Sequence, residues 1–308
     1  MSKIVVALSI LIAVIAIWAV PQTGAAHSRV RWSSATDSRS SLPVKFKGTR
    51  DRGLVVDIWI GDAGPFAFAL DTGAGISLVN RRLTAAAGLS VERSRQPIVG
   101  GLSTSSISSN QQTTLQNISI GTQRSRLTAS VKAAVVENLP SDIDGILDPL
   151  DVSPYGYSID LPNETLEIFD VNRGRLQQSV VTADSALVRW IKGDNTGRPF
   201  VKLGDGRLAL IDTGSSFGLA VSDGVVAGNH GRQSRAVRDL GGGAVQSMRV
   251  APTTVSIGSL ELRGVPTDVL SGVASGTPVI IGRAALYPFK ITFDPVARLI
   301  AIEPSEER

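Results

Sequence analysis

The chain has 308 residues, no cysteine, two histidines and a formal net charge of +4 at pH 7. The lack of cysteine excludes disulfides, thiolate catalysis and cysteine-ligated zinc, and two histidines leave little for a metal centre, so we expect no metal and no cofactor. The basic residues form no run interleaved with aromatic side chains, so a nucleic-acid partner is not expected either.

The N-terminal segment, residues 1–26, is predicted to direct export. Lys3 precedes an uncharged apolar run over residues 4–20, and small residues follow at Ala25 and Ala26. This pattern is typical of a secretory signal peptide. The run is long for a signal peptide and slightly short for a spanning helix, so an uncleaved membrane tether through residues 4–20 is the alternative. Both interpretations predict an exported protein, periplasmic or extracellular.

Beyond this segment the sequence predicts a linker and then a β-rich protein. Residues 27–44 are rich in serine and arginine and lack periodicity, which indicates a flexible linker. The remainder alternates short strand-like runs with turns, and only two short helix candidates begin, near Arg81 and Gly282. We therefore predict an all-β fold with an N-terminal lobe over residues 45–175 and a C-terminal lobe over residues 176–308.

The two predicted lobes share a repeated pattern that suggests an internal duplication. An Asp-Thr-Gly motif follows an apolar run at Asp71 and again at Asp212. A glycine cluster begins 29 positions after each aspartate, with Gly100 and Gly101 in the first half and Gly241 and Gly242 in the second. Each half then ends in a strand–turn–strand pattern, from Tyr157 and from Phe289. Equivalent elements in this order favour two lobes related by a pseudo-twofold axis.

Asp71 and Asp212 are the candidate catalytic residues. Two carboxyl groups about 3 Å apart cannot both ionise readily, so they share one proton. The ionised member acts as a general base toward a water molecule, while the protonated member donates to a carbonyl oxygen. Such a pair hydrolyses an amide without a metal or a covalent intermediate, and it titrates as a unit.

The residues after each aspartate are expected to support the two loops. Thr72 and Thr213 carry short hydroxyl groups that can hydrogen-bond across the axis and hold the loops in register. Gly73 and Gly214 leave room for backbone N–H groups to approach the carboxyl groups. Ser215 is a further candidate in the second loop.

The twin motif resembles the aspartic peptidases, both the bilobal pepsin-like and the retropepsin-like enzymes. In that family an apolar-apolar-glycine segment passes beneath each loop, and Ile280, Ile281 and Gly282 match it in the second half. In the first half Ile146 and Leu147 match, but Asp148 stands where glycine is expected. The resemblance covers most of residues 50–303.

The resemblance implies a bilobal pepsin-like (acid protease) fold, with two β-barrel lobes related by a pseudo-twofold axis and a central cleft. It implies an aspartic endopeptidase that binds a polypeptide substrate in the cleft between the lobes, and we expect a monomer. Gly100 and Gly101, and Gly241 and Gly242, are expected to form flaps over the substrate. Because the first glycine cluster lacks a nearby tyrosine, it is more similar to a retropepsin flap, as in a fused dimer with two flaps.

Two other functions fit parts of the sequence. A non-catalytic peptide-binding protein on the same scaffold is favoured by Asp148 and by the flap without tyrosine, because a fold does not guarantee the chemistry. The Gly-x-Ser-x-Gly pattern around Ser216 fits a nucleophile elbow, but its only nearby partners are Asp223 and His230, and the surrounding α/β alternation is absent.

The residue after each Asp-Thr-Gly motif differs, since Ala74 follows the first and Ser215 the second. In the family a hydroxyl here hydrogen-bonds the outer carboxylate oxygen and favours ionisation. Ala74 cannot do so, and we expect Ala74→Ser to move the acidic limb of the pH–rate profile to lower pH. Retained activity with an unmoved limb would contradict this expectation.

Overall fold

The computed structural model describes residues 43–49, 53–103, 107–127, 129–152, 154–171, 184–193, 197–223, 234–238 and 243–306. The predicted export signal and residues 27–42 of the predicted linker lie outside these ranges. Val44, assigned above to the linker, is instead buried in the first strand. Across the described ranges, no helix is long and apolar enough to cross a membrane.

The described chain is mostly β-strand, which confirms the predicted all-β class. The first half contributes β1 (Val44–Lys45), β2 (Lys47–Thr49), β3 (Gly53–Ile60), β4 (Ala63–Leu70), β5 (Ser77–Asn80), β6 (Glu92–Gly100), β7 (Ile107–Leu115), β8 (Ile118–Ile120), β9 (Val131–Val136), β10 (Gly145–Leu147), β11 (Tyr155–Asp160) and β12 (Thr165–Asp170). The second half contributes β13 (Ala186–Arg189), β14 (Ile191–Lys192), β15 (Pro199–Lys202), β16 (Leu208–Asp212), β17 (Leu219–Ser222), β18 (Ser234–Arg238), β19 (Ala244–Ile257), β20 (Leu260–Ser271), β21 (Val279–Gly282), β22 (Phe289–Asp294) and β23 (Leu299–Pro304).

Both short helices predicted from the sequence form. They are α1 (Arg81–Ala86) and α2 (Arg283–Leu286), and a 3-10 turn, η1 (Pro149–Val152), follows β10. Asn80 caps α1 because its side chain accepts a hydrogen bond of 2.7 Å from the Leu83 N–H. Each helix directly follows a strand beside an aspartate loop, β5 in the first half and β21 in the second.

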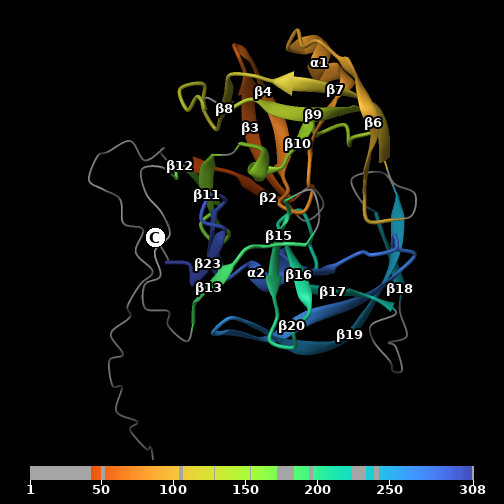
Figure 1. Cartoon of the computed structure of the whole chain (residues 1–308), viewed down its shortest axis with the longest axis vertical. Coiled ribbons are helices and arrows are strands. Elements are labelled where there is room, and N and C mark those ends of the chain that lie inside the picture. The colour runs from red at the N-terminus through yellow and green to blue at the C-terminus, as the bar shows by residue number, and fades with distance from the viewer. Residues whose placement is uncertain are drawn as a thin grey trace, which may run out of the picture.

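Two sheets repeat the same strand order. The first sheet has the order β2-β3-β4-β10-β5-β9-β7-β6, with β8 paired to β3, and the second has the order β14-β15-β16-β21-β17-β20-β19-β18. The parallel pairs occupy equivalent places, β4–β10 and β5–β9 in the first sheet and β16–β21 and β17–β20 in the second. The duplication inferred from the sequence is therefore present in the topology, with the first sheet at the top of Figure 1 and the second at the bottom.

A third sheet joins the two halves. Its order is β1-β12-β11-β22-β23-β13, and its central pair, β11 and β22, is antiparallel and comes from different halves. The two strand–turn–strand patterns predicted from the sequence form the hairpins β11–β12 and β22–β23. Backbone hydrogen bonds thus connect the halves directly, along the side of the molecule in Figure 1.

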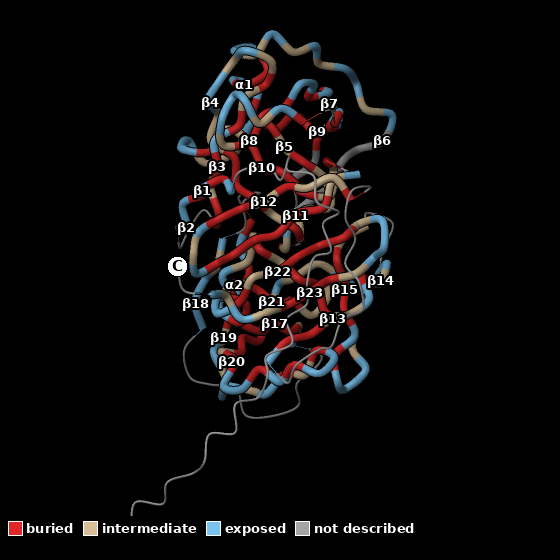
Figure 2. The backbone as a smooth tube through the Cα atoms, turned by 90° about the vertical axis from the view of Figure 1, so that its left-hand side faces the viewer, coloured by how far each residue is buried: buried red, intermediate tan, exposed pale blue. Residues whose placement is uncertain are grey.

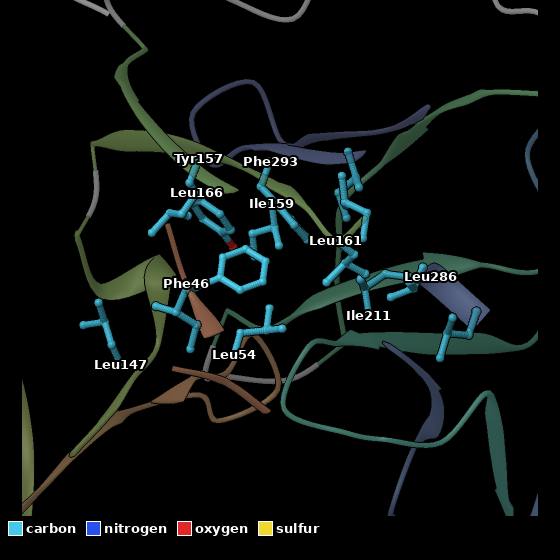
Figure 3. Packing of buried hydrophobic residues seen from close by; sticks show 14 of the residues in the cluster. Phe46, Leu54, Leu147, Tyr157, Ile159, Leu161, Leu166, Ile211, Leu286 and Phe293 are labelled. Carbon is cyan, nitrogen blue, oxygen red and sulfur yellow. The ribbon is translucent and has the colours of Figure 1, made fainter. Parts of the chain in front are cut away.

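The hydrophobic core lies beneath this joining sheet and extends to both aspartate loops. Tyr157 and Phe293 have no exposed surface and stack with ring centroids 4.7 Å apart. Leu147 and Ile211 belong to the same buried cluster (Figure 3), and buried segments fill the strands of both halves (Figure 2). Because Ile211 immediately precedes Asp212 and Leu147 contacts Asp71, close packing fixes the chain directly below both candidate catalytic residues.

Candidate active site

Strand pairing places the two aspartates at equivalent positions in their two sheets. Asp71 directly follows β4, and its N–H donates to the Leu147 carbonyl oxygen of the parallel strand β10 at 3.0 Å. Asp212 ends β16 and lies opposite Gly282 of the parallel strand β21. Each aspartate therefore occupies the carboxyl end of a buried parallel pair, held by backbone hydrogen bonds.

The two loops are interlocked through Thr72 and Thr213, which are both fully buried. The Thr72 hydroxyl donates to the Ile211 carbonyl oxygen at 2.7 Å and accepts from the Thr213 N–H at 3.0 Å. The Thr213 hydroxyl donates to the Leu70 carbonyl oxygen at 3.3 Å and accepts from the Thr72 N–H at 3.2 Å. Each loop thus satisfies the backbone of the other, as the sequence predicted for these two threonines.

Glycine is required where the loops cross. A methyl group on Gly73 would lie 2.6 Å from the Asp212 Cγ atom, and one on Gly214 would collide with the Asp71 carboxyl group. The Gly73 N–H donates to Asp71 Oδ1 at 2.8 Å. The structure therefore brings Asp71, Gly73, Asp212 and Gly214 together at one point.

The carboxyl groups of Asp71 and Asp212 are close enough to share a hydrogen bond when one of them is protonated, and the pKa of both is raised. For Asp71, burial is the main cause, and the Gly73 N–H acts in the opposite direction. For Asp212, burial raises the pKa most, followed by the negative charge of Asp71. Removal of water from two adjoining acids favours a state in which the pair holds a proton.

Arg283 is a charged neighbour of the pair that no motif in the sequence predicted. Its Nη1 atom donates to the carbonyl oxygens of Thr213 and Gly214, at 2.7 and 3.0 Å. Its positive charge lowers the pKa of Asp71, while burial lowers the pKa of Arg283 itself. The sequence feature that could have indicated Arg283 is its position directly after the apolar-apolar-glycine segment that runs beneath the second loop.

Ser215 contacts Asp212 in a different way from the one expected. Its backbone N–H donates to Asp212 Oδ1 at 3.0 Å, whereas its hydroxyl accepts a hydrogen bond of 3.3 Å from the Phe217 N–H. The expected bond from hydroxyl to carboxylate is absent here because the hydroxyl is turned toward the loop backbone. The contrast between Ala74 and Ser215 therefore does not act through such a bond.

The first predicted flap touches the second half of the molecule. Gly100 ends β6 and Gly101 follows it, and the next residue, Leu102, accepts a hydrogen bond of 3.1 Å from the Ala274 N–H. The Leu102 side chain also packs against a small buried cluster that contains Phe217. The predicted residues of the second flap, Gly241 and Gly242, lie outside the described residues.

The nucleophile-elbow interpretation does not fit the structure. Ser216 lies between two strands, β16 and β17, whereas an elbow connects a strand to a helix. Ser216 instead lines a cavity of about 570 Å³ together with Arg283 and Tyr287. His230 lies outside the described residues, and within those residues no cluster of three or more His, Asp or Glu side chains could hold a metal ion.

The comparisons with known proteins agree with the resemblance noted in the sequence. The family model described as aspartyl protease matches residues 56–147. This segment runs from β3 to β10 and contains the first Asp-Thr-Gly motif and the strand beneath it. A search of curated proteins found no match to the chain. The match confirms the similarity to the aspartic peptidases.

The interlocked threonines should contribute measurably to stability. Thr72→Val keeps the side-chain shape but leaves the Thr213 N–H and the Ile211 carbonyl without their partner. We expect the free energy of unfolding, measured by chemical denaturation, to fall by about 1–3 kcal/mol or more. The exposed Thr122→Val serves as the control and should change it by less than about 0.5 kcal/mol. Equal effects of the two substitutions would contradict the interlock.

The raised pKa values should make stability depend on pH. Between the ordinary and the raised pKa the folded protein holds protons that the unfolded chain has lost, so stability falls as the pH rises through this window. We expect the stability of Asp212→Asn to fall less across this window, because the variant has lost one of the two titrating groups. Each pKa unit by which folding raises the pKa of that group in wild type corresponds to about 1.4 kcal/mol. Denaturation midpoints measured from pH 3 to pH 8 provide the test, with exposed Asp62→Asn as the control. The same slope in wild type and Asp212→Asn would refute this account.

Proposed function

We propose that the chain is an aspartic endopeptidase that hydrolyses peptide bonds with a water molecule activated between Asp71 and Asp212. The observation that carries this proposal is the pair of adjoining, partly buried carboxyl groups at the crossing of the two loops, both with raised pKa values. The match of residues 56–147 to the aspartyl proteases supports it independently.

The chemistry follows from the shared proton. The ionised carboxylate removes a proton from the water molecule as the water oxygen attacks the carbonyl carbon of the substrate. At the same time the protonated carboxyl group donates its proton to the carbonyl oxygen. A tetrahedral diol results. One carboxyl group then protonates the amide nitrogen while the other regains a proton from the diol, the C–N bond breaks, and the pair returns to its singly protonated state. The N–H groups of Gly73 and Ser215 hold the two carboxyl groups in place throughout.

The proposal includes the bilobal pepsin-like arrangement, with a β-barrel lobe for each half and the substrate bound between them. The repeated strand order and the contact of the first flap with the Ala274 segment support this arrangement. An extended polypeptide would pair with the flap strand β6 as an added strand. Because one chain supplies both aspartates, a monomer suffices for activity.

We further propose that the protein acts outside the cytoplasm. The apolar run over residues 4–20 and the small residues that follow it support export, either as a released protein or as one tethered by an uncleaved helix. A monomeric enzyme outside the cytoplasm would meet unfolded or extended polypeptides as substrates.

The alternative is a peptide-binding protein without catalysis. One specific observation favours it, namely that Asp148 replaces the glycine expected beneath the first loop and thus alters the surroundings of Asp71. The raised pKa of both aspartates argues for the enzyme, because a proton-sharing pair has no evident use in binding alone.

Cleavage of an unfolded protein at several pH values tests the proposal. Wild type should cleave it, and Asp71→Asn or Asp212→Asn should lower kcat by a factor of about 100 or more. Asp205→Asn is the control, since this exposed acid pairs with Arg207, and it should retain activity. Binding of the polypeptide by wild type without any cleavage would favour the alternative and overturn the enzyme.

A further inference from the structure

Asp148 occupies, in the first half, the position that Gly282 occupies in the second. The parallel registers align Leu147 beside Leu70 and Ile281 beside Ile211. Asp148, the residue after β10, is therefore equivalent to Gly282, the last residue of β21. Gly282 lies directly opposite Asp212. Asp148 is only 1% exposed, so an ionisable group is buried beneath the loop that carries Asp71.

The two loops differ in length in a way that makes room for this side chain. A methyl group at Gly282 would lie 2.5 Å from the Phe217 carbonyl oxygen and 2.9 Å from the Ser215 hydroxyl, so the second loop excludes any side chain there. The first loop is one residue shorter: Leu78 pairs with β10 seven positions after Asp71, whereas Ala220 pairs with β21 eight positions after Asp212. The shorter loop, with Ala74 in place of Ser215, accommodates a carboxyl group.

The Asp148 side chain connects the first loop to the turn after β10. Its Oδ1 atom accepts from the Leu150 N–H at 2.9 Å. The Gly75 N–H lies close enough to lower the pKa of the Asp148 carboxyl group. The Asp148 N–H donates to the Ser77 hydroxyl at 3.1 Å. That hydroxyl in turn donates to Asp151 Oδ2 at 2.7 Å. Asp148 is therefore bonded to the turn after β10 and, through its backbone N–H, to Ser77 of the segment that follows Asp71.

The charges around Asp148 are predominantly negative. Burial raises its pKa most, and the charges of Asp151 and Asp71 raise it further, against the Leu150 and Gly75 N–H groups. Burial raises the pKa of Tyr157, on β11, most, and the negative charge of Asp148 raises it further.

We propose that Asp148 is a positioning residue for the first aspartate loop and that the gain or loss of its proton is linked to that of the Asp71–Asp212 pair. The three carboxyl groups then form one titrating unit, in which ionisation of Asp148 opposes the loss of the last proton from the pair. The effect on reaction rate rests on the proposed function, whereas the linkage itself concerns only the protons. A buried acid in the first half thus extends the pH range of the singly protonated pair upward.

The linkage is measurable without any activity. We suggest following the carboxyl ¹³C signals by NMR across pH in wild type, Asp71→Asn and Asp160→Asn, with Asp148 assigned through its backbone. Asp160 is a buried control whose side chain bonds Asn163 and Ser305 instead of either aspartate loop. The pKa of Asp148 should fall by about half a unit or more in Asp71→Asn only. An unchanged Asp148 titration in Asp71→Asn would overturn the proposal.

The effect of Asp148 on the pair is tested with Asp148→Asn, which keeps an oxygen acceptor for the Leu150 N–H. In this variant the upper apparent pKa of the Asp71–Asp212 pair should be lower by about half a unit or more, because the nearby negative charge is gone. In a cleavage assay the alkaline limb should move to lower pH while KM stays constant. An unmoved upper pKa in folded Asp148→Asn refutes the linkage, whereas absence of cleavage by wild type refutes only the proposed function.

Discussion

The reciprocal hydrogen bonds of Thr72 and Thr213 are the constraint on which the rest of the site depends. Two acids in contact repel each other once both are ionised, and burial makes the charges costly. The threonines hold the loops together through bonds to the backbone, made in a fully buried setting where an unpaired group is expensive. Gly73 and Gly214 are then needed because any side chain would displace the opposing carboxyl group.

The joining sheet gives this contact a rigid support. β11 and β22 pair at the centre of that sheet, and the core beneath it includes Leu147 and Ile211, which hold the chain below the two aspartates. Movement of one half against the other would require disruption of backbone hydrogen bonds as well as of the packed core. The distance between the two carboxyl groups is therefore set by the whole molecule.

The two halves have the same strand order but different chemistry beneath their loops. The second half combines Ser215 and Gly282 in a longer loop, and the first combines Ala74 and Asp148 in a shorter one. Arg283 supplies a positive charge at the second loop, and Asp148 and Asp151 place acids at the first. The duplicated fold thus presents the pair with unequal surroundings on its two sides.

The sequence by itself determined the β class, the two short helices, the internal duplication and the identity of the paired aspartates. Each of these features depends on a local sequence pattern or on the repetition of such a pattern. The tertiary structure alone decided which groups reach the carboxyl groups: the Ser215 N–H in place of its hydroxyl, the Arg283 contacts with the second loop, and Asp148 beside a loop 77 residues earlier in the chain. Burial and hydrogen-bond partners arise from segments that are distant in sequence, and loop length decides which side chain fits, so motif spacing could locate the site but not its electrostatics.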